Sequence, residues 1–290
     1  MQAALFYRIP CAHGEASLWH EKRQQFFWLD ILKKKLHNID PLTKVHQAWS
    51  LRSLSGTIVP DEQGRIVIGM QGFVDRFDPD TGKVETLLEL EQDRPHNRSN
   101  DGKCDPAGRF WLGTMELDGK PHEGNLYCIG PDLNPEVKIA RTSISNGIVW
   151  TKDKKTMYYI DTSTGCVQAY DYDDISGGIR FRENVIRLSP GMGYPDGMTI
   201  DENDRLWVAH WGGAGVYHWD PLTGEMLAKV DVAAPNVSSC VFGGKDLDTL
   251  YITTSRKDLE KADLEKYPLS GSIFAVRPGV KGFAPNVFRG

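Results

Sequence analysis

Two carboxylates and two carboxamides occupy a recurring place in this chain, and their side-chain oxygens suit a divalent metal ion. Each stands within two residues of a glycine and upstream of an apolar run; the four are Glu15, Asn100, Asn146 and Asp196. Ca²⁺, Mg²⁺ and Mn²⁺ prefer such oxygen ligands, and Zn²⁺ or Fe²⁺ also accept them. If the four side chains converge, the pattern predicts a site for one divalent ion, with positions left for water and substrate.

The spacing of these residues favours one shared site over four unrelated turns. Each lies 13 or 11 residues before the second residue of an apolar run; the pairs are Glu15 with Trp28, Asn146 with Tyr159, Asn100 with Trp111, and Asp196 with Trp207. A difference of two residues keeps a side chain on the same side of a β-strand. Asn-Gly and Asp-Gly are also common turn dipeptides. Four polar residues at equivalent positions relative to the apolar runs are, however, consistent with a metal site.

The glycines beside these residues are expected to serve the same site. They are Gly14, Gly102, Gly147 and Gly197. Glycine permits tight turns and lets the backbone approach a bound species closely. We therefore expect these positions to form turns next to the ligand.

The apolar runs themselves form an internal repeat. Six runs recur with their second residues 39 to 48 positions apart, at 27–30, 66–69, 110–113, 158–161, 206–209 and 250–253. Asp-Pro and Thr-Gly clusters between them are typical of hairpin turns. Because four strands in about 40 to 50 residues make one propeller blade, the sequence predicts an all-β, six-bladed β-propeller with four-stranded antiparallel blades around a central channel.

This architecture would use the whole chain, 1–290, as a single domain. The first strand of each blade lines the channel, so the four polar positions should lie at one end of it. Segment 3–9 is expected to join the last blade beside 272–276, which removes an exposed sheet edge. One or two helical turns are expected in 258–267. A pair of β-sandwiches is the main competing architecture, and the blade-length period disfavours it.

Composition excludes several classes of function. The net charge is −5 with no long basic run, so nucleic acid is not an expected partner. The five cysteines are scattered without a Cys-x-x-Cys pair, which argues against a disulfide framework and a thiolate metal site and fits a reducing compartment. No signal peptide or membrane-spanning run is recognised. A cytoplasmic monomer without membrane contact is therefore expected.

Six segments in chain order resemble the SMP-30/gluconolactonase/regucalcin family of six-bladed propeller lactonases. They are 14–19 (GEASLW), 98–103 (RSNDGK), 105–109 (DPAGR), 113–115 (GTM), 145–148 (SNGI) and 195–198 (PDGM). The ordered set spans blades one to five, so the resemblance covers essentially the whole chain.

The resemblance implies roles for individual residues. Glu15, Asn146 and Asp196 would be the metal ligands, and Asp196 would also act as the general base. Asn100 would sit beside the metal and hold substrate or a bound water. Arg98 would contact the hydroxyl or carbonyl oxygens of the substrate.

An acidic residue after Gly113-Thr114-Met115 would contact the sugar in such a protein. Either Glu116 or Asp118 fits this description. The stretch from there to Asn125 is expected to form a lid over the mouth of the channel.

The function implied is divalent-metal-dependent hydrolysis of a sugar lactone, such as glucono-1,5-lactone or a pentonolactone, to the aldonic acid. The metal would polarise the ring carbonyl, while Asp196 takes a proton from the attacking water. Two alternatives stay open: a non-enzymatic calcium-binding regulatory propeller, and a propeller esterase acting on organophosphate or aromatic esters. The Gly-x-Ser-x-Gly motif of serine hydrolases and the His-Glu-x-x-His motif of zincins are absent.

The aromatic residues divide into core and channel candidates. Trp28, Trp111 and Trp207 repeat within the apolar runs and are expected to pack between blades. Trp19 and Trp211 are expected nearer the channel, where they are candidates for stacking on a sugar. His210 is expected to pack in the core or at the rim.

Overall fold

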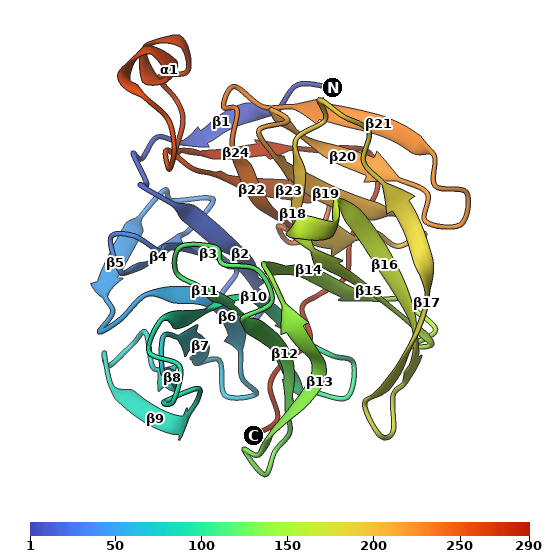
Figure 1. Cartoon of the computed structure of the whole chain (residues 1–290). Coiled ribbons are helices and arrows are strands. Elements are labelled where there is room, and N and C mark those ends of the chain that lie inside the picture. The colour runs from blue at the N-terminus through green and yellow to red at the C-terminus, as the bar shows by residue number, and fades with distance from the viewer.

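Six four-stranded sheets follow one another along the chain and surround a central axis (Figure 1). The structure is a computed structural model that describes residues 1–290. Every strand pair within a sheet is antiparallel; the pairs within blade one are typical. The predicted six-bladed β-propeller is confirmed.

The first three blades contain twelve strands in chain order. Blade one consists of β2 (Gly14–His20), β3 (Gln25–Asp30), β4 (Lys35–Ile39) and β5 (His46–Ser50). Blade two consists of β6 (Ser55–Pro60), β7 (Ile66–Met70), β8 (Phe73–Phe77) and β9 (Val84–Glu89). Blade three consists of β10 (Asn97–Cys104), β11 (Phe110–Glu116), β12 (Gly124–Ile129) and β13 (Pro135–Thr142).

The last three blades follow the same order, with one exchange. Blade four consists of β14 (Ser145–Trp150), β15 (Thr156–Asp161), β16 (Cys166–Asp173) and β17 (Gly178–Arg187). Blade five consists of β18 (Tyr194–Ile200), β19 (Leu206–Trp211), β20 (Gly215–Trp219) and β21 (Met226–Asp231). Blade six consists of β22 (Val237–Gly243), β23 (Thr249–Thr254), β24 (Ile273–Val276) and β1 (Ala4–Tyr7).

The N-terminal strand closes the ring, as the sequence predicts. β1 pairs antiparallel with β24, with Ala4 opposite Ala275 and Tyr7 opposite Ile273. This pairing covers the outer edge of β24 that would otherwise be exposed.

The predicted helical turns are also present as α1 (Lys261–Lys266), and a 3-10 turn, η1 (Thr162–Thr164), follows β15. No helix has the length and apolar character needed to cross a membrane.

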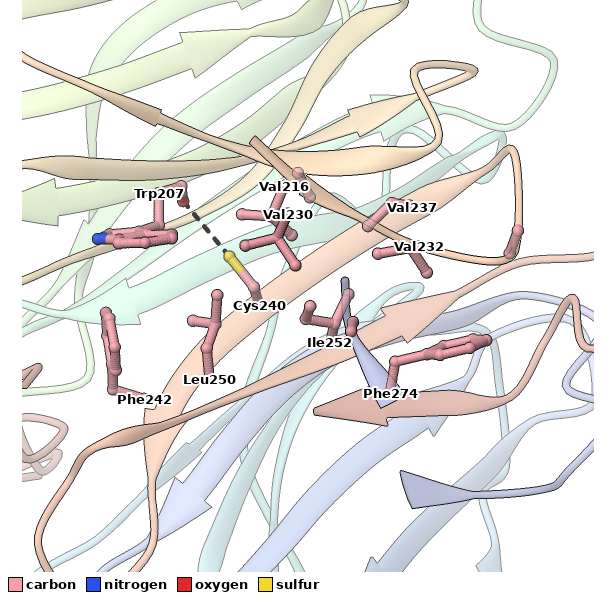
Figure 2. Packing of buried hydrophobic residues seen from close by; sticks show 13 residues of the cluster. Trp207, Val216, Val230, Val232, Val237, Cys240, Phe242, Leu250, Ile252 and Phe274 are labelled. Carbon is pink, nitrogen blue, oxygen red and sulfur yellow. Dashed lines mark hydrogen bonds between the residues drawn. The ribbon is translucent and has the colours of Figure 1, made fainter. Parts of the chain in front are cut away.

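Apolar side chains from neighbouring blades make the core. Figure 2 shows the cluster between blades five and six, where the Cys240 thiol donates a hydrogen bond to the Trp207 carbonyl at 3.3 Å. The repeated tryptophans are at most 1% exposed, which confirms their predicted packing; they are Trp28, Trp111 and Trp207. Fully burying one large apolar side chain stabilises a fold by roughly 1.5–3 kcal/mol.

An aspartate fixes the hairpin turn that precedes three of the apolar runs. Asp105 Oδ1 accepts hydrogen bonds from the backbone N–H groups of Ala107 and Arg109 at 3.0 and 2.9 Å. Equivalent bonds fix the turns that begin at Asp61 and Asp201. Because these turns fix where the second strand of a blade begins, they also fix the register of the innermost strand opposite it.

Candidate functional site

Every innermost strand contains a β-bulge near its first residues. The register shifts lie between Glu15 and Leu18, Ser55 and Thr57, Ser99 and Gly102, Ser145 and Ile148, Pro195 and Met198, and Val237 and Ser239. A bulge adds one residue to a strand and re-aims its side chains. The three predicted metal ligands and Asn100 lie in or directly beside these bulges.

The bulges, rather than regular strand alternation, explain why Glu15, Asn100, Asn146 and Asp196 occupy equivalent positions in their blades. Asn100, Asn146 and Asp196 each stand two residues before the first pair that follows the shift. Glu15 stands three residues before it, and its neighbour Ala16 has a left-handed φ of 54°, which is uncommon for a residue other than glycine. The extra residue interrupts strict alternation, so bulge geometry sets the direction of these side chains.

Hydrogen bonds between blades hold the bulges at one level of the channel. Asn100 Nδ2 donates to the carbonyl of Ser145 at 2.7 Å. Asn146 Nδ2 donates to Thr162 Oγ1 at 2.7 Å, and that hydroxyl donates to the carbonyl of Pro195 at 2.7 Å. Asn100 is thus bonded directly to the residue before Asn146, and Asn146 is connected through Thr162 to the residue before Asp196. Asn100, Asn146 and Asp196 therefore lie on neighbouring blades at the same end of the channel.

Blade one joins this level from the other direction around the ring. Ser238 Oγ of blade six donates to the carbonyl of Gly14 at 2.6 Å, directly before Glu15. Glu15, Asn146 and Asp196 are all buried, with exposures of 4–6%. The three residues predicted as metal ligands are therefore placed on blades one, four and five at a common depth.

The glycines beside the candidate site residues do not form the turns that the sequence predicts. None of Gly14, Gly102, Gly147 and Gly197 has a positive φ, and all four lie within strands. A Cβ on Gly147 would lie 2.8 Å from the carbonyl oxygen of Asp196, and one on Gly14 would lie 2.6 Å from that of Thr254. The expectation of turns beside the ligand is wrong: here glycine allows close backbone approach within and between blades.

Glu15 and Asp196 form a buried pair of carboxylates that repel each other. Burial raises the pKa of Glu15 to about 8, and the negative charge of Asp101 adds to this effect. Burial also raises the pKa of Asp196 well above its ordinary value, with the charges of Glu15 and Asp101 contributing. Glu15 Oε2 accepts one backbone hydrogen bond, from Ala16 at 2.7 Å. A bound cation would offset the repulsion that remains.

The positive charge of Arg98 acts on both carboxylates and opposes the rise in their pKa values. Its Nη1 donates to the carbonyl of Ser99 at 2.8 Å and to Asn100 Oδ1 at 2.7 Å. Burial lowers the pKa of Arg98 to about 10, while Glu15 and Asp196 act in the opposite direction. The guanidinium is therefore charged at neutral pH, and its Nε and Nη2 donors make no hydrogen bond within the protein.

Two residues of the site escaped the sequence analysis. Asp101 is 7% exposed, and its negative charge adds to the rise in the pKa values of Glu15 and Asp196. Strand alternation would have placed it on the face opposite Asn100, but the bulge in β10 removes that alternation. His13 stacks on Trp211 with ring centroids 5.3 Å apart. Its position just before Gly14-Glu15 was the only available signal.

The two tryptophans predicted near the channel have different environments. Trp211 ends β19, is partly exposed and stacks on His13, which places it at the candidate site. Trp19 is 1% exposed and stacks on Tyr251 with centroids 5.8 Å apart. The prediction for Trp19 is wrong, because its ring packs into the core between blades one and six. His210 packs on Tyr217 inside blade five, as expected.

The acidic residues after Gly113-Thr114-Met115 lie at the end of β11 and in the turn that follows it. Glu116 ends β11, and its Oε2 accepts hydrogen bonds from the backbone N–H groups of Asp118 and Lys120 at 2.9 and 3.0 Å. Asp118 itself is exposed. Glu116 thus closes its own turn, and a contact of either residue with substrate stays a prediction.

The donor set suits a hard cation held partly by amide oxygens. No three histidine, cysteine or acidic side chains of the chain gather as metal ligands. A metal ion here would therefore need the amide oxygen of Asn146 beside the carboxylates of Glu15 and Asp196. Two buried carboxylates with raised pKa values and one amide fit such an ion.

Comparison with known proteins gives a consistent result across the chain. The sequence model described as SMP-30/Gluconolactonase/LRE-like region matches residues 13–256. The chain is 35% identical over 291 residues to the putative sugar lactone lactonase YvrE of Bacillus subtilis, covering 100% of this chain and 99% of that protein. It is 37% identical over 280 residues to regucalcin of Danio rerio, covering 96% of this chain and 95% of that protein.

Solved structures share the same architecture. A luciferin-regenerating enzyme superimposes with a TM-score of 0.92 at 31% identity, covering 99% of both chains. Regucalcin from Agrobacterium tumefaciens, described as a calcium-binding protein, superimposes with a TM-score of 0.94 at 25% identity, covering 100% of this chain and 97% of that one.

Proposed function

The chain belongs to the SMP-30/gluconolactonase/LRE-like family, and on that premise we propose that it hydrolyses a sugar lactone to the aldonic acid with one divalent metal ion. The observation that carries this proposal is the buried, mutually repelling pair Glu15 and Asp196. Asn100, Asn146 and Arg98 surround the pair at the same end of the channel. The remaining expectations, a cytoplasmic monomer that binds neither nucleic acid nor membrane, belong to the same proposal.

Glu15, Asn146 and Asp196 would hold the metal. When bound, such an ion supplies electrophilic assistance at the lactone carbonyl and acidifies a water molecule. Ca²⁺ is the first candidate, because the Agrobacterium relative is described as a calcium-binding protein. Mn²⁺, Mg²⁺, Zn²⁺ and Fe²⁺ are the other candidates, since the oxygen donors do not select one of them strictly.

Asp196 would accept the proton of the attacking water. Its burial raises its pKa well above the ordinary value, so its ionised form is a stronger base than an exposed carboxylate. Binding a cation would lower that pKa again. The proposed role therefore requires that one oxygen of Asp196 stays available to the water.

Arg98 and Asn100 would orient the substrate. The free Nε and Nη2 donors of Arg98 suit the hydroxyl and carbonyl oxygens of a sugar lactone. Together with Asp101, these residues give the site polar walls, which favours a polyhydroxylated lactone over an aromatic ester. The stacked pair of His13 and Trp211 supplies one apolar wall, a common arrangement for binding the face of a sugar ring.

Proton release from freshly dissolved glucono-1,5-lactone and xylonolactone tests the proposal. We would compare protein stripped with EDTA against the same protein restored with Ca²⁺, Mn²⁺, Mg²⁺, Zn²⁺ or Fe²⁺, with the spontaneous rate subtracted. We expect acceleration only in restored samples.

Other results would favour the alternatives. Metal binding by folded protein without hydrolysis of any lactone would favour a calcium-binding regulatory propeller. Faster cleavage of phenyl acetate or an organophosphate than of either lactone would favour an esterase.

A further inference from the structure

A cavity in the central channel lies away from Glu15 and Asp196. It has a volume of about 350 Å³ and occupies the other part of the central channel, along the later residues of the innermost strands. Ala16 and Asp101 border it, so it begins directly behind the residues of the candidate lactone site. We call this space the channel cavity; nothing argued above gives it a role.

The C-terminal segment 277–290 forms one wall of the channel cavity. It leaves blade six, and the carbonyl of Lys281 accepts a hydrogen bond from the backbone of Glu202 in blade five at 2.8 Å. Further on, the backbone N–H of Phe288 donates to the carbonyl of Pro60 in blade two at 2.8 Å. Residues 283–286 pass the cavity between these anchors. Figure 1 shows the chain ending on the far side of the ring from β24.

Lys103 brings a positive charge into the channel cavity. It lies on β10, borders the cavity and is otherwise surrounded by protein. Its Nζ donates to the carbonyl of Met198, which uses one of the three donors of an ammonium group. Lys103 forms no salt bridge, although the charge of Asp101 acts on it. Asp101 Oδ1 accepts the backbone N–H of Gly102 at 2.7 Å.

The remaining walls of the channel cavity are mostly apolar. Their apolar members include Leu18, Ile58, Val149, Trp150, Ile200 and Phe283. Thr57 lines the cavity too, but its hydroxyl is already used by the carbonyl of Gly102 at 2.9 Å. Lys152 and Lys154 stand at the exposed rim. Lys154 pairs with Asp174 at 3.4 Å, which leaves Lys103 and Lys152 against Asp101 and gives the cavity a preference for negative charge.

We propose that the channel cavity is a second small-molecule site, which binds an organic monocarboxylate with an apolar body. The carboxylate would pair with Lys103, and the apolar body would fill the space between β2, β6, β14 and the C-terminal segment. Lys103 is half-buried and has no salt bridge, so a carboxylate partner would offset part of the cost of withdrawing its charge from water. The volume lies at the lower end of the range of small-molecule pockets, which fits a ligand about the size of benzoate. This site does not depend on the lactonase proposal.

Titration with benzoate, followed by the methyl NMR signals of Ile58, Val149 and Ile200, tests this site. We expect saturable shifts with a dissociation constant of about 1 mM or below. Benzamide has the same shape without the charge and should bind at least about tenfold more weakly. Asp196→Asn should leave benzoate binding unchanged, which separates this cavity from the lactone site.

Lysine variants complete the test. Lys103→Met should weaken benzoate binding at least about tenfold. Lys152→Gln changes an exposed rim residue without an ion pair, so it keeps the fold, and it should weaken binding about twofold at low salt and less at high salt. Benzoate and benzamide binding equally well, unchanged affinity in Lys152→Gln, or no saturable shift would overturn the proposal.

Discussion

Glu15 and Asp196 repel each other in a place where burial already disfavours their charged forms. Burial holds the pKa of Glu15 at about 8 in the folded protein, against an ordinary value of 4.5. Between these values the folded protein keeps a proton that the unfolded chain has released. The free energy of unfolding of the metal-free protein therefore falls as the pH rises from 4.5 to about 8.

Glu15→Gln should reveal this contribution in thermal melts of EDTA-treated protein. The variant should melt at least about 3 °C above the wild type at pH 8, because it removes one of the repelling charges. The difference should shrink towards pH 5, where Glu15 is protonated in the folded state. Saturating Ca²⁺ should raise the melting temperature of the wild type more than that of the variant. A difference that grows towards pH 5 would contradict this reading.

Asp196→Asn should lower kcat for lactone hydrolysis at least about 100-fold in metal-restored protein, since it removes the proposed proton acceptor. Asp246→Asn is the matched control, because Asp246 is exposed at the hairpin turn after β22. It should keep the wild-type rate. Near-native kcat in metal-loaded Asp196→Asn would exclude this residue as the general base.

At the scale of the strand, the β-bulges and their glycines hold the site together. Asp196 lies in the bulge of β18, and the neighbouring strand β14 approaches it at Gly147. A Cβ on Gly147 would lie 2.6 Å from the Cβ of Met198. Side chains in this contact would have to displace the strand that carries a proposed metal ligand.

Gly147→Ala should therefore destabilise the protein by about 1–3 kcal/mol and also lower lactonase activity. Urea denaturation measures the first effect and proton release the second. Gly130→Ala is the control: a Cβ there meets only a side-chain oxygen of Asp132, at 3.2 Å, and its φ is not left-handed. If both variants behave alike, close strand approach is not what this glycine provides.

The sequence predicts strands far better than it predicts bulges. The repeated apolar runs and hairpin turns predict six blades and the closure by β1, because both follow from residue type and period. A bulge inserts one residue without changing that pattern, so its place in β10 could not be read from residues 97–104. Asp101 was missed and Trp19 misplaced because both assignments depend on which way a side chain points near such a bulge.

At the scale of the molecule, the C-terminal segment links blades that are distant along the chain. Phe288 is 1% exposed and packs edge-on against Phe110 of blade three. Together with the pairing of β1 and β24, this contact joins the end of the chain to its middle. We propose on this ground that residues 1–290 form one domain, which should unfold in a single calorimetric transition. Two separate transitions would argue for two domains.

Phe288→Ala should lower the free energy of unfolding by about 3 kcal/mol or more, as expected for removing a fully buried phenylalanine. Phe181→Ala serves as the control, because Phe181 is 52% exposed, and it should change stability by less than about 1 kcal/mol. Urea denaturation compares the two. A loss below about 1 kcal/mol in Phe288→Ala would mean that the segment is not anchored as described.

The central claim is that Glu15, Asn146 and Asp196 hold one catalytic metal ion, and locating that ion tests it most directly. Crystals grown with Mn²⁺ would give an anomalous difference map that marks the metal independently of any assigned ligand. We predict one dominant peak about 2.0–2.6 Å from oxygens of all three residues. A dominant peak elsewhere in the channel, or none in crystals of protein that hydrolyses lactone with Mn²⁺, would contradict the account.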